Sequence, residues 1–365
     1  MAGRLRPARS SPDDWRKNLE LDCGRTLLLA RPATRLVGGI VDRTAAGVQR
    51  GTGGSDSVER GLGPLETWRL VRLFCLLAGW TYPLFAQWVW GGGWLSQLGT
   101  NSGLGRGFID GGGASTIQVV GGLTALSVTW ILGARRGKFS SDGIPAAIPG
   151  HSPVLALAGC LMAWVGWLGL NCAGAILFAG SEPSSVVLIV LNTTLCATSA
   201  GLTAAIVTRV RFGRPDASLC ANGWMAGLVA SSAAAAFLKP AAAILVGIVA
   251  GGLVLFAIDL LESRLAIDDP GGAVSVHAVA GIWGLLAGSF LSFGGLEGQW
   301  LAQLAGIATL LGVVLPLTYG LNWLLDKAYP QRVDEEGETQ GMDLYELGAG
   351  AYPEFVVHSD EFTPR

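Results

Sequence analysis

The sequence has little charge and no basic excess. Only 14% of its 365 residues are Asp, Glu, Lys or Arg, the formal net charge is −2, and the mean hydropathy is +0.47. Soluble domains seldom have such a composition, and a slightly acidic chain lacks the basic surface that nucleic acids require. We therefore expect no nucleic-acid partner. The chain also lacks zinc-ligand spacing and a phosphate-binding loop, so neither a metal nor a cofactor is predicted.

Cysteines are few and scattered. Four of the six lie inside apolar runs, namely Cys75, Cys160, Cys172 and Cys196. Cysteine in such surroundings behaves as a small hydrophobic residue, so no disulfide framework is expected. The first residues also lack an apolar core of signal-peptide length. Membrane insertion is therefore expected to depend on later segments.

Long uncharged stretches dominate the rest of the chain. A helix needs roughly 20 apolar residues to cross a bilayer. The expected spans are residues 70–92, 114–134, 154–179, 185–208, 221–238, 241–262, 272–294 and 300–325. The runs are continuous and rich in Gly, Ala and Ser, which excludes the short alternating strands of a β-barrel and favours close helix packing. We predict an all-α integral membrane protein, a polytopic bundle of about eight transmembrane helices.

Basic residues between these spans predict the orientation, because cytoplasmic loops retain positive charge. One face would receive Arg69, Arg72, Arg135, Arg136, Lys138, Arg209, Arg211, Arg214, Arg264, Lys327 and Arg332. The other would receive only Arg106 and Lys239. We expect both ends of the helical unit to be cytoplasmic, with residues 1–63 forming a loop-rich or disordered segment, 64–330 the membrane domain and 331–365 a cytoplasmic tail.

Polar groups at membrane depth are costly and are therefore functional candidates. His277 can bond a neighbouring carbonyl or handle a proton, since its ordinary pKa is near 6.5. Gln118 is either a contact between helices or part of a pathway. Asp110 either caps the helix that follows it or attracts a cation. Asp268 and Asp269, which precede Pro270, are typical of a helix start.

Tryptophans gather at one predicted membrane boundary. Trp88, Trp90 and Trp94 surround a run of three glycines. Tryptophan is ordinarily an anchor at the membrane interface. The faces of the same rings can also hold a small cation, with a gain of about 0.5–2 kcal/mol. Both interpretations remain open from the residues alone.

Several motifs together resemble the ammonium transporter family. They are IDDP at 267–270, VHAVAGIWG at 276–284, NGWMAGLV at 222–229, GWLGLN at 166–171, WVWGGG at 88–93, RV at 332–333, GMD at 341–343 and AYPE at 351–354. The likeness extends from about residue 66 to residue 355, roughly 290 of 365 residues. Members of this family have eleven membrane helices, ten of which form two inverted repeats around one pore per subunit.

The resemblance implies a function and a set of site residues. The chain would be a truncated version of the eleven-helix fold that supplies helices four to eleven, while residues 1–63 do not resemble the first three. Trp90 matches an aromatic that recruits ammonium at the outer vestibule, and Asp110 matches an acidic residue that supports it. His277 matches one of two paired pore histidines, and Trp167 is expected beside the pore. A homotrimer in the plasma (inner) membrane is implied, with no enzymatic activity, and a PII-type regulator is an expected partner of the tail.

Three positions depart from the family pattern. Gln118 stands where the first pore histidine is expected, Leu170 where a pore phenylalanine is expected, and Gly174 where a recruitment serine is expected. Glutamine cannot take up a proton near neutral pH, so a relay between two histidines is not possible.

The leading hypothesis is channel-like uptake of ammonium or ammonia along a pore lined by His277. An ammonium sensor that signals through the tail and an inactive truncated remnant are the alternatives. A frameshift, a misassigned start or degeneration would each explain the unmatched beginning. An unrelated secondary transporter fits the glycine content but not the motifs.

Overall fold

The computed structural model describes residues 72–73, 76–146, 148, 152–292, 298–334, 337–338 and 345. The predicted N-terminal segment, 1–63, lies outside these residues, as does most of the predicted tail. The regular structure of the described residues is helical, apart from isolated β-bridges. The predicted all-α class is confirmed.

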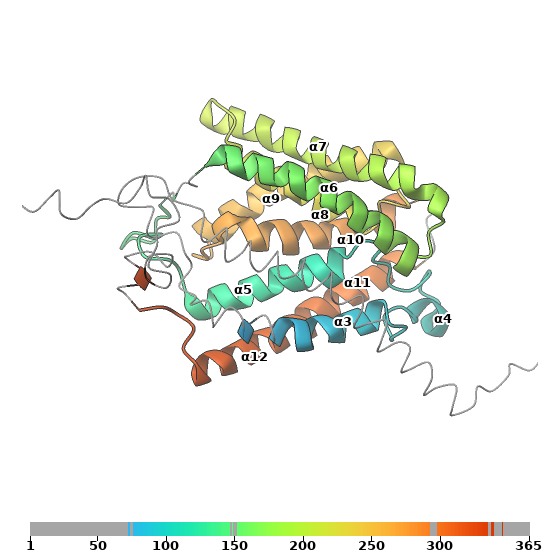
Figure 1. Ribbon diagram of the computed structural model, residues 1–365, viewed down its shortest axis with the longest axis horizontal. Helices are drawn as coiled ribbons and strands as arrows, with labels where there is room; N and C mark the ends of the chain where they lie inside the picture. Colours follow the sequence, from blue (N-terminus) through green and yellow to red (C-terminus); the bar gives the residue numbers. More distant parts are fainter. Residues whose placement is uncertain are drawn as a thin grey trace, which may run out of the picture.

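Ten α-helices make up most of the described residues (Figure 1). They are α3 (Tyr82–Val89), α4 (Leu98–Ser102), α5 (Val120–Leu132), α6 (Pro153–Phe178), α7 (Val186–Phe212), α8 (Ala217–Ser231), α9 (Pro240–Ser263), α10 (Ala280–Leu291), α11 (Gln299–Thr309) and α12 (Leu315–Ala328). In the part of the chain that the structure describes, four π-helical turns lie between or before these helices: η2 (Leu77–Thr81), η3 (Ala114–Val119), η6 (Val274–Val279) and η7 (Leu310–Val314). Two short 3₁₀ turns, η4 (Pro183–Ser185) and η5 (Pro270–Gly272), precede α7 and η6.

Six helical stretches of the described chain are long and apolar enough to cross a membrane. They are Ala114–Leu132, Pro153–Phe178, Pro183–Phe212, Pro240–Ser263, Pro270–Leu291 and Gln299–Ala328. Each coincides with a predicted span. The described part of the predicted span 70–92 contains η2, α3 and the helical residues 72, 73 and 76, and the predicted span 221–238 is cut short where α8 ends. The count of eight stays a prediction.

Helix α8 ends early because the carbonyls that follow it accept hydrogen bonds from other segments. The backbone carbonyls of Ser232 and Ala233 accept hydrogen bonds from the amides of Gly112 and Gly111, so they are not used to continue the helix. The Asn192 amide then donates to the carbonyls of Ala235 and Leu238, both at 2.8 Å. These side-chain bonds satisfy buried backbone groups in an irregular stretch that lipid could not satisfy. Hydropathy cannot detect such an ending.

Two central helices lie between two groups of helices (Figure 1). The stretch η3–α5 packs against η6–α10. On one side, α6, α7, α8 and α9 pack against each other, with α7 in contact with both α8 and α9; on the other side, α12 packs against α5, and α3 lies beside η3. Large apolar side chains of α6 and α7 point outward, as expected for helices that face lipid or another apolar surface.

Candidate functional site

The two central helices begin with the same local structure. In each, an aspartate precedes a glycine-containing turn and then a π-helical turn, η3 or η6. Gln118 lies in η3, eight residues after Asp110, and His277 lies in η6, eight residues after Asp269. Single π turns are rare within α-helices, and those that do occur are frequently found at functional sites. The equal spacing places the two candidate pore side chains at equivalent positions.

Asp110 holds the start of η3. Its Oδ1 accepts the amides of Gly113 and Ala114, at 2.9 and 2.7 Å. Its Oδ2 accepts the amides and the hydroxyls of Ser115 and Thr116. Six donors occupy a carboxylate that is only 2% exposed. The geometry therefore supports the capping interpretation for the carboxylate itself.

Asp269 does the same for η6, with fewer bonds. Its Oδ1 accepts the amide of Val274 at 2.9 Å, and its Oδ2 accepts the amide and hydroxyl of Ser275 at 2.9 and 2.7 Å. The carboxylate also lies near the positive end of the helix dipole. The predicted role of this aspartate as a helix start agrees with its contacts.

Glycines allow the two central helices to touch. Gly122 follows Gln118 by one helical turn, and a Cβ there would lie 2.5 Å from the amide nitrogen of Ala278. Gly281 follows His277 by one turn, and a Cβ there would lie 2.6 Å from the side chain of Val119. Close backbone approach through small residues is the usual way in which membrane helices pack. This crossing brings Gln118 and His277 together.

Gln118 and His277 meet in the interior. His277 Nδ1 lies 2.8 Å from Gln118 Oε1. An amide oxygen can only accept, so Nδ1 carries the proton in this arrangement. Gln118 is fully buried and His277 is 7% exposed, so the imidazole faces the neighbouring helix. Gln118 Nε2 has no partner among the residues that the structure describes.

Trp90 lies at the C-terminal end of α3 and contacts Asp110 through the backbone. Its Nε1 donates to the Asp110 carbonyl at 2.8 Å. Its ring stacks on Phe178, with centroids 4.2 Å apart and planes 11° apart. One face of the indole is therefore covered. Trp94 packs edge-on against Trp88 nearby. The predicted recruitment residues Trp90 and Asp110 thus lie together, and Phe178 is an aromatic that the sequence did not single out.

The candidate residues of α6 belong to a second group. Trp167 Nε1 donates to Ser232 Oγ at 2.8 Å. Gly174 packs so closely on the glycine run before η3 that a Cβ there would lie 2.3 Å from the Gly111 carbonyl oxygen. A serine would not fit at this position without a backbone shift. Leu170 is partly buried and packs on the apolar core. Trp167 thus contacts the end of α8, and Gly174 contacts the glycine run before η3.

Asn171 lies on the same face of α6 and was not a sequence candidate. It is 2% exposed, and its Nδ2 donates to Thr193 Oγ1 at 3.0 Å and to Ser231 Oγ at 3.1 Å. Its Oδ1 has no partner among the described residues. The sequence contains one usable signal for it, an amide inside an otherwise apolar run, because such groups are costly in lipid.

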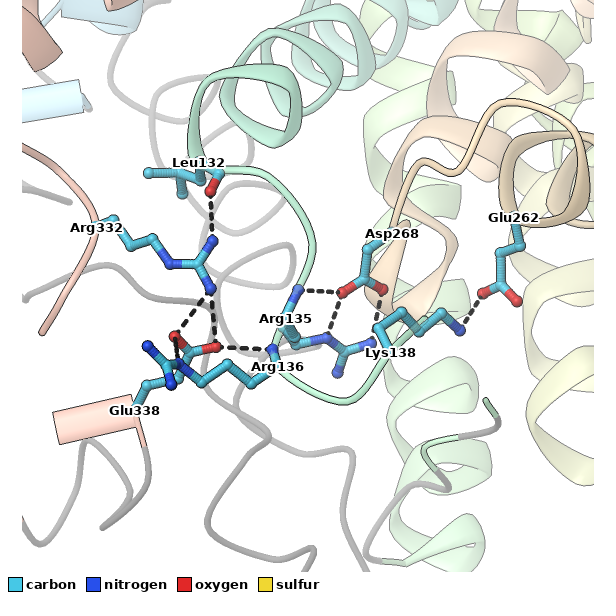
Figure 2. A network of polar contacts seen from close by, with 8 residues as sticks. All are labelled: Leu132, Arg135, Arg136, Lys138, Glu262, Asp268, Arg332 and Glu338. Atoms are coloured by element: carbon cyan, nitrogen blue, oxygen red, sulfur yellow. Dashed lines mark hydrogen bonds and ion pairs between the residues drawn. The ribbon is translucent and has the colours of Figure 1, made fainter. Parts of the chain in front are cut away.

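A charge network joins the C-terminal end of α5 to the start of the second central helix, η6–α10 (Figure 2). Arg135, just after α5, forms a bidentate pair with Asp268, at 2.7 and 2.9 Å. Burial alone would raise the pKa of Asp268, but the hydrogen bonds and charge of Arg135, with the charge of Lys138, outweigh it and lower that pKa. Lys138 also pairs with Glu262 at the end of α9, at 2.7 Å.

Part of the tail joins this network. Glu338 pairs with Arg332 at 2.9 Å and accepts the backbone amide of Arg136 at 3.0 Å. Arg332 donates to the carbonyl of Leu132, the last residue of α5, at 2.7 Å. Figure 2 shows Glu338 between the two arginines, beside the loop that leaves α5. The helix that carries Gln118 is thus tied both to Asp268 and to the tail.

Sequence comparisons with known proteins all find the same family. A sequence profile described as the Ammonium Transporter Family matches residues 66–352. Ammonium transporter Amt2 of Archaeoglobus fulgidus is 37% identical over 77% of this chain and 63% of its own length. Ammonium transporter Amt1 of Haloferax mediterranei is 33% identical over 78% of this chain and 57% of its own length. The chain therefore spans less than two thirds of these curated relatives.

Solved structures give the same result for the fold. A protein titled Sensor Amt Protein superposes with a TM-score of 0.71 at 28% identity, covering 84% of this chain and 74% of the other. Mep2 of Saccharomyces cerevisiae superposes with a TM-score of 0.66 at 25% identity, covering 84% and 68%. The predicted likeness to a known membrane fold is confirmed.

Proposed function

The chain belongs to the ammonium transporter family, and we propose that it carries ammonium or ammonia across a membrane by a channel-like route. The family match, the apolar spans and the named relatives support this proposal. The observation that carries it is the buried contact between Gln118 and His277, where the two central helices cross.

The charge of ammonium opposes its passage through the bilayer centre. A bare cation at the bilayer centre costs from a few to more than ten kcal/mol. A route past His277 therefore favours ammonia over ammonium, with the proton left behind. Gln118 bonds the imidazole but cannot take up a proton near neutral pH. In this chain, His277 is therefore the one member of the pair that can exchange a proton with the substrate.

Recruitment is proposed at the aromatic end. The face of Trp90 that Phe178 does not cover is offered to the cation, and Phe178 holds the ring in place. Asp110 acts indirectly, because its carboxylate is saturated while its carbonyl accepts the bond from Trp90 Nε1. Leu170 and Gly174 shape the wall beside this entrance, and Trp167 supports it through Ser232.

The charge pattern of the sequence and the family resemblance support a proposal for orientation and assembly. We propose uptake across the plasma (inner) membrane by a multi-pass homotrimer, with both ends of the helical unit in the cytoplasm. The basic residues Arg135 and Lys138 lie with the tail at one end of the bundle, which is the expected cytoplasmic face. The tail is also the proposed contact for a PII-type regulator.

An ammonium-jump experiment tests the transport proposal. The purified chain is reconstituted into liposomes that contain a pH-sensitive dye, and ammonium chloride is added outside. Ammonia entry predicts an alkaline transient faster than in protein-free liposomes, and His277→Ala is expected to slow it. Trp90→Ala should raise the half-saturating concentration about two- to thirtyfold, which is the range of one cation–π contact. Rates equal to those of empty liposomes would refute transport.

A sensor is the second candidate. The observation in its favour is the connection of the tail to α5 through Glu338 and Arg332, in a chain that superposes on a protein titled as a sensor. A sensor would bind ammonium and change the accessibility of the tail without flux. Limited proteolysis of the tail with and without ammonium, compared with the liposome assay, separates the two functions.

A further inference from the structure

Two buried glutamines of α11 contact the chain segment that leads to Asp110. Gln299 and Gln303 are 4% and 3% exposed, and they lie one helical turn apart on the same face of α11. Neither was a sequence candidate. We propose that this pair, the glutamine clamp, positions the indole of Trp90 for the incoming cation. The inference rests on the proposed function for the role of Trp90 and adds two positioning residues to it.

Each glutamine forms two hydrogen bonds with backbone groups. Gln299 Oε1 accepts the amide of Arg106 at 3.0 Å, and its Nε2 donates to the carbonyl of Gly107 at 2.8 Å. Gln303 Oε1 accepts the amide of Ile109 at 2.9 Å, and its Nε2 donates to the carbonyl of the same residue at 2.8 Å. A side-chain amide carries the same donor and acceptor as a peptide group. The clamp therefore pairs with the segment as a neighbouring strand would.

The clamped segment has no regular structure that would hold it otherwise. Gly105 and Gly107 have φ angles of +54° and +86°, which lie in the left-handed region that glycine tolerates. Residues 108–110 belong to no helix and to no β-bridge. Buried backbone groups in such a stretch need partners from elsewhere. The clamp supplies them on both sides of Phe108, whose own amide donates to the Leu95 carbonyl at 2.9 Å.

The bonds of Gln303 end one residue before Asp110. The Ile109 carbonyl belongs to the same planar peptide unit as the Asp110 nitrogen. Only the two backbone dihedral angles of Asp110 therefore separate the unit held by Gln303 from the Asp110 carbonyl. That carbonyl accepts the hydrogen bond from Trp90 Nε1 at 2.8 Å. A displacement of Ile109 should thus be passed to the indole through Asp110.

Aromatic packing gives a second connection between α11 and the end of α3. Phe108 is 4% exposed and packs on α11 at Gly306, about one turn beyond Gln303, where a Cβ would overlap its ring. Phe108 also packs edge-on against Phe85 of α3, with ring centroids 6.4 Å apart. Helix α3 ends at Trp90. One face of α11 therefore holds both the backbone and an aromatic side chain of the segment.

A purely structural role and a positioning role predict different kinetics. Glutamines that only satisfy buried backbone groups stabilise the fold. Their loss lowers the amount of folded protein and leaves the affinity of the folded fraction unchanged. Glutamines that position the indole of Trp90 change the half-saturating ammonium concentration, and they do so only while the indole is present.

Ammonium-jump rates of the full-length chain in liposomes test the clamp. Gln303→Met keeps the length of the side chain but removes both hydrogen bonds. It should raise the half-saturating concentration by no more than Trp90→Ala does, about two- to thirtyfold, with an unchanged maximal rate per folded protein. In a Trp90→Ala background it should give no further rise, because the positioned ring is absent. Gln299→Met, whose bonds lie further from Asp110, should give a smaller rise.

Gln331 supplies a matched control. It is a glutamine with 1% exposure whose Nε2 donates to the Asn322 carbonyl, and it lies beyond the opposite end of the stretch Gln299–Ala328. Gln331→Met should lower the unfolding midpoint in detergent without changing the half-saturating concentration. If Gln303→Met does not fold, Gln299→Met replaces it in both backgrounds. Effects of the clamp and Trp90→Ala that multiply would overturn the proposal, as would a fall in maximal rate alone.

Amide hydrogen exchange separates the clamp from the transport proposal. The amides of Trp90, Gly91 and Gly93 bond the last turn of α3, and they should exchange faster in Gln303→Met but not in Gln331→Met. If the unsubstituted chain shows no flux, transport is rejected, and the exchange rates still decide whether Gln303 positions Trp90. Flux with a half-saturating concentration that Gln303→Met leaves unchanged would keep transport and reject the clamp.

Discussion

The helix starts at Asp110 and Asp269 share a backbone design but differ in what surrounds them. Both aspartates cap a π turn, both precede a candidate pore residue by eight positions, and both helices have a glycine one turn later. Asp110 is held by neutral hydrogen bonds beside an aromatic cluster. Asp269 adjoins Asp268, which is held by an ion pair. The pore side chains also differ, Gln118 against His277.

The comparison teaches that placement and chemistry are separate properties here. Capping by an aspartate and close packing by a glycine determine where the pore side chain lies. Neither depends on whether that side chain is glutamine or histidine. A change of the pore residue can therefore alter proton transfer while the crossing of the two helices is kept.

The largest expected difference concerns the two capping aspartates. Asp110→Ala leaves six buried donors without an acceptor and should destabilise the chain by more than about 4 kcal/mol, whereas Asp269→Ala should cost about 2 kcal/mol. Midpoint temperatures in detergent measure both variants, with Asp110→Asn and Asp269→Asn as shape-matched controls. Equal losses at the two positions would contradict this ranking.

Asp268→Asn tests the ion pair that only the second start has. Removing one partner of a buried pair leaves Arg135 without its carboxylate, and the expected loss is about 3 kcal/mol. Asp259→Asn is the control, because its pair with Arg211 is about half exposed on both sides and should contribute less than about 1 kcal/mol. Similar midpoint shifts in the two variants would show that burial does not distinguish these pairs.

The two packing glycines should not be equivalent. Gly122→Ala places a methyl group 2.5 Å from a backbone nitrogen, whereas Gly281→Ala meets first a valine side chain that can move. We expect about 2 kcal/mol for the first and about 1 kcal/mol for the second. Gly159→Ala, on an open face of α6, should be neutral or slightly stabilising. A larger destabilisation by Gly281→Ala than by Gly122→Ala would contradict this order.

Gln118→His makes the two pore positions chemically alike. If glutamine is a weakened replacement, flux in the liposome assay should be restored or rise roughly tenfold, below the full range of a positioned acid or base. His277→Gln gives the reciprocal variant and should lose flux. Loss of flux in both variants would mean that unlike partners are required.

The smallest expected effect is a loss of folding stability at acidic pH. Because the pKa of Asp268 is lower in the folded chain than in the unfolded one, its contribution is fully present above its unfolded pKa, near 3.9. Stability should then fall as pH decreases below about 4 and through the folded pKa. Asp268→Asn should flatten this part of the midpoint-against-pH curve. An unchanged slope would exclude Asp268 as its source.

Several features were predictable because their causes are local. Runs of apolar residues predicted the six helices that are long enough to span, since length and hydropathy require no partner. An aspartate before a glycine run predicted both helix starts, because capping involves residues within one turn. The candidates Trp90, Asp110, Gln118 and His277 were identified from the sequence. Their roles in transport remain predictions.

The sequence alone thus determined the helical class, the six described helices that are long enough to span a membrane and the polar residues inside them, because hydropathy and capping act over a few neighbouring positions. Only the tertiary structure decided that Gln118 meets His277, that Trp90 stacks on Phe178, and that α8 ends at Ser231. Those features depend on contacts between segments far apart in the chain. Asn171 is the clearest case: its oxygen can pack against the neighbouring backbone only because Gly112, on another segment, has no side chain.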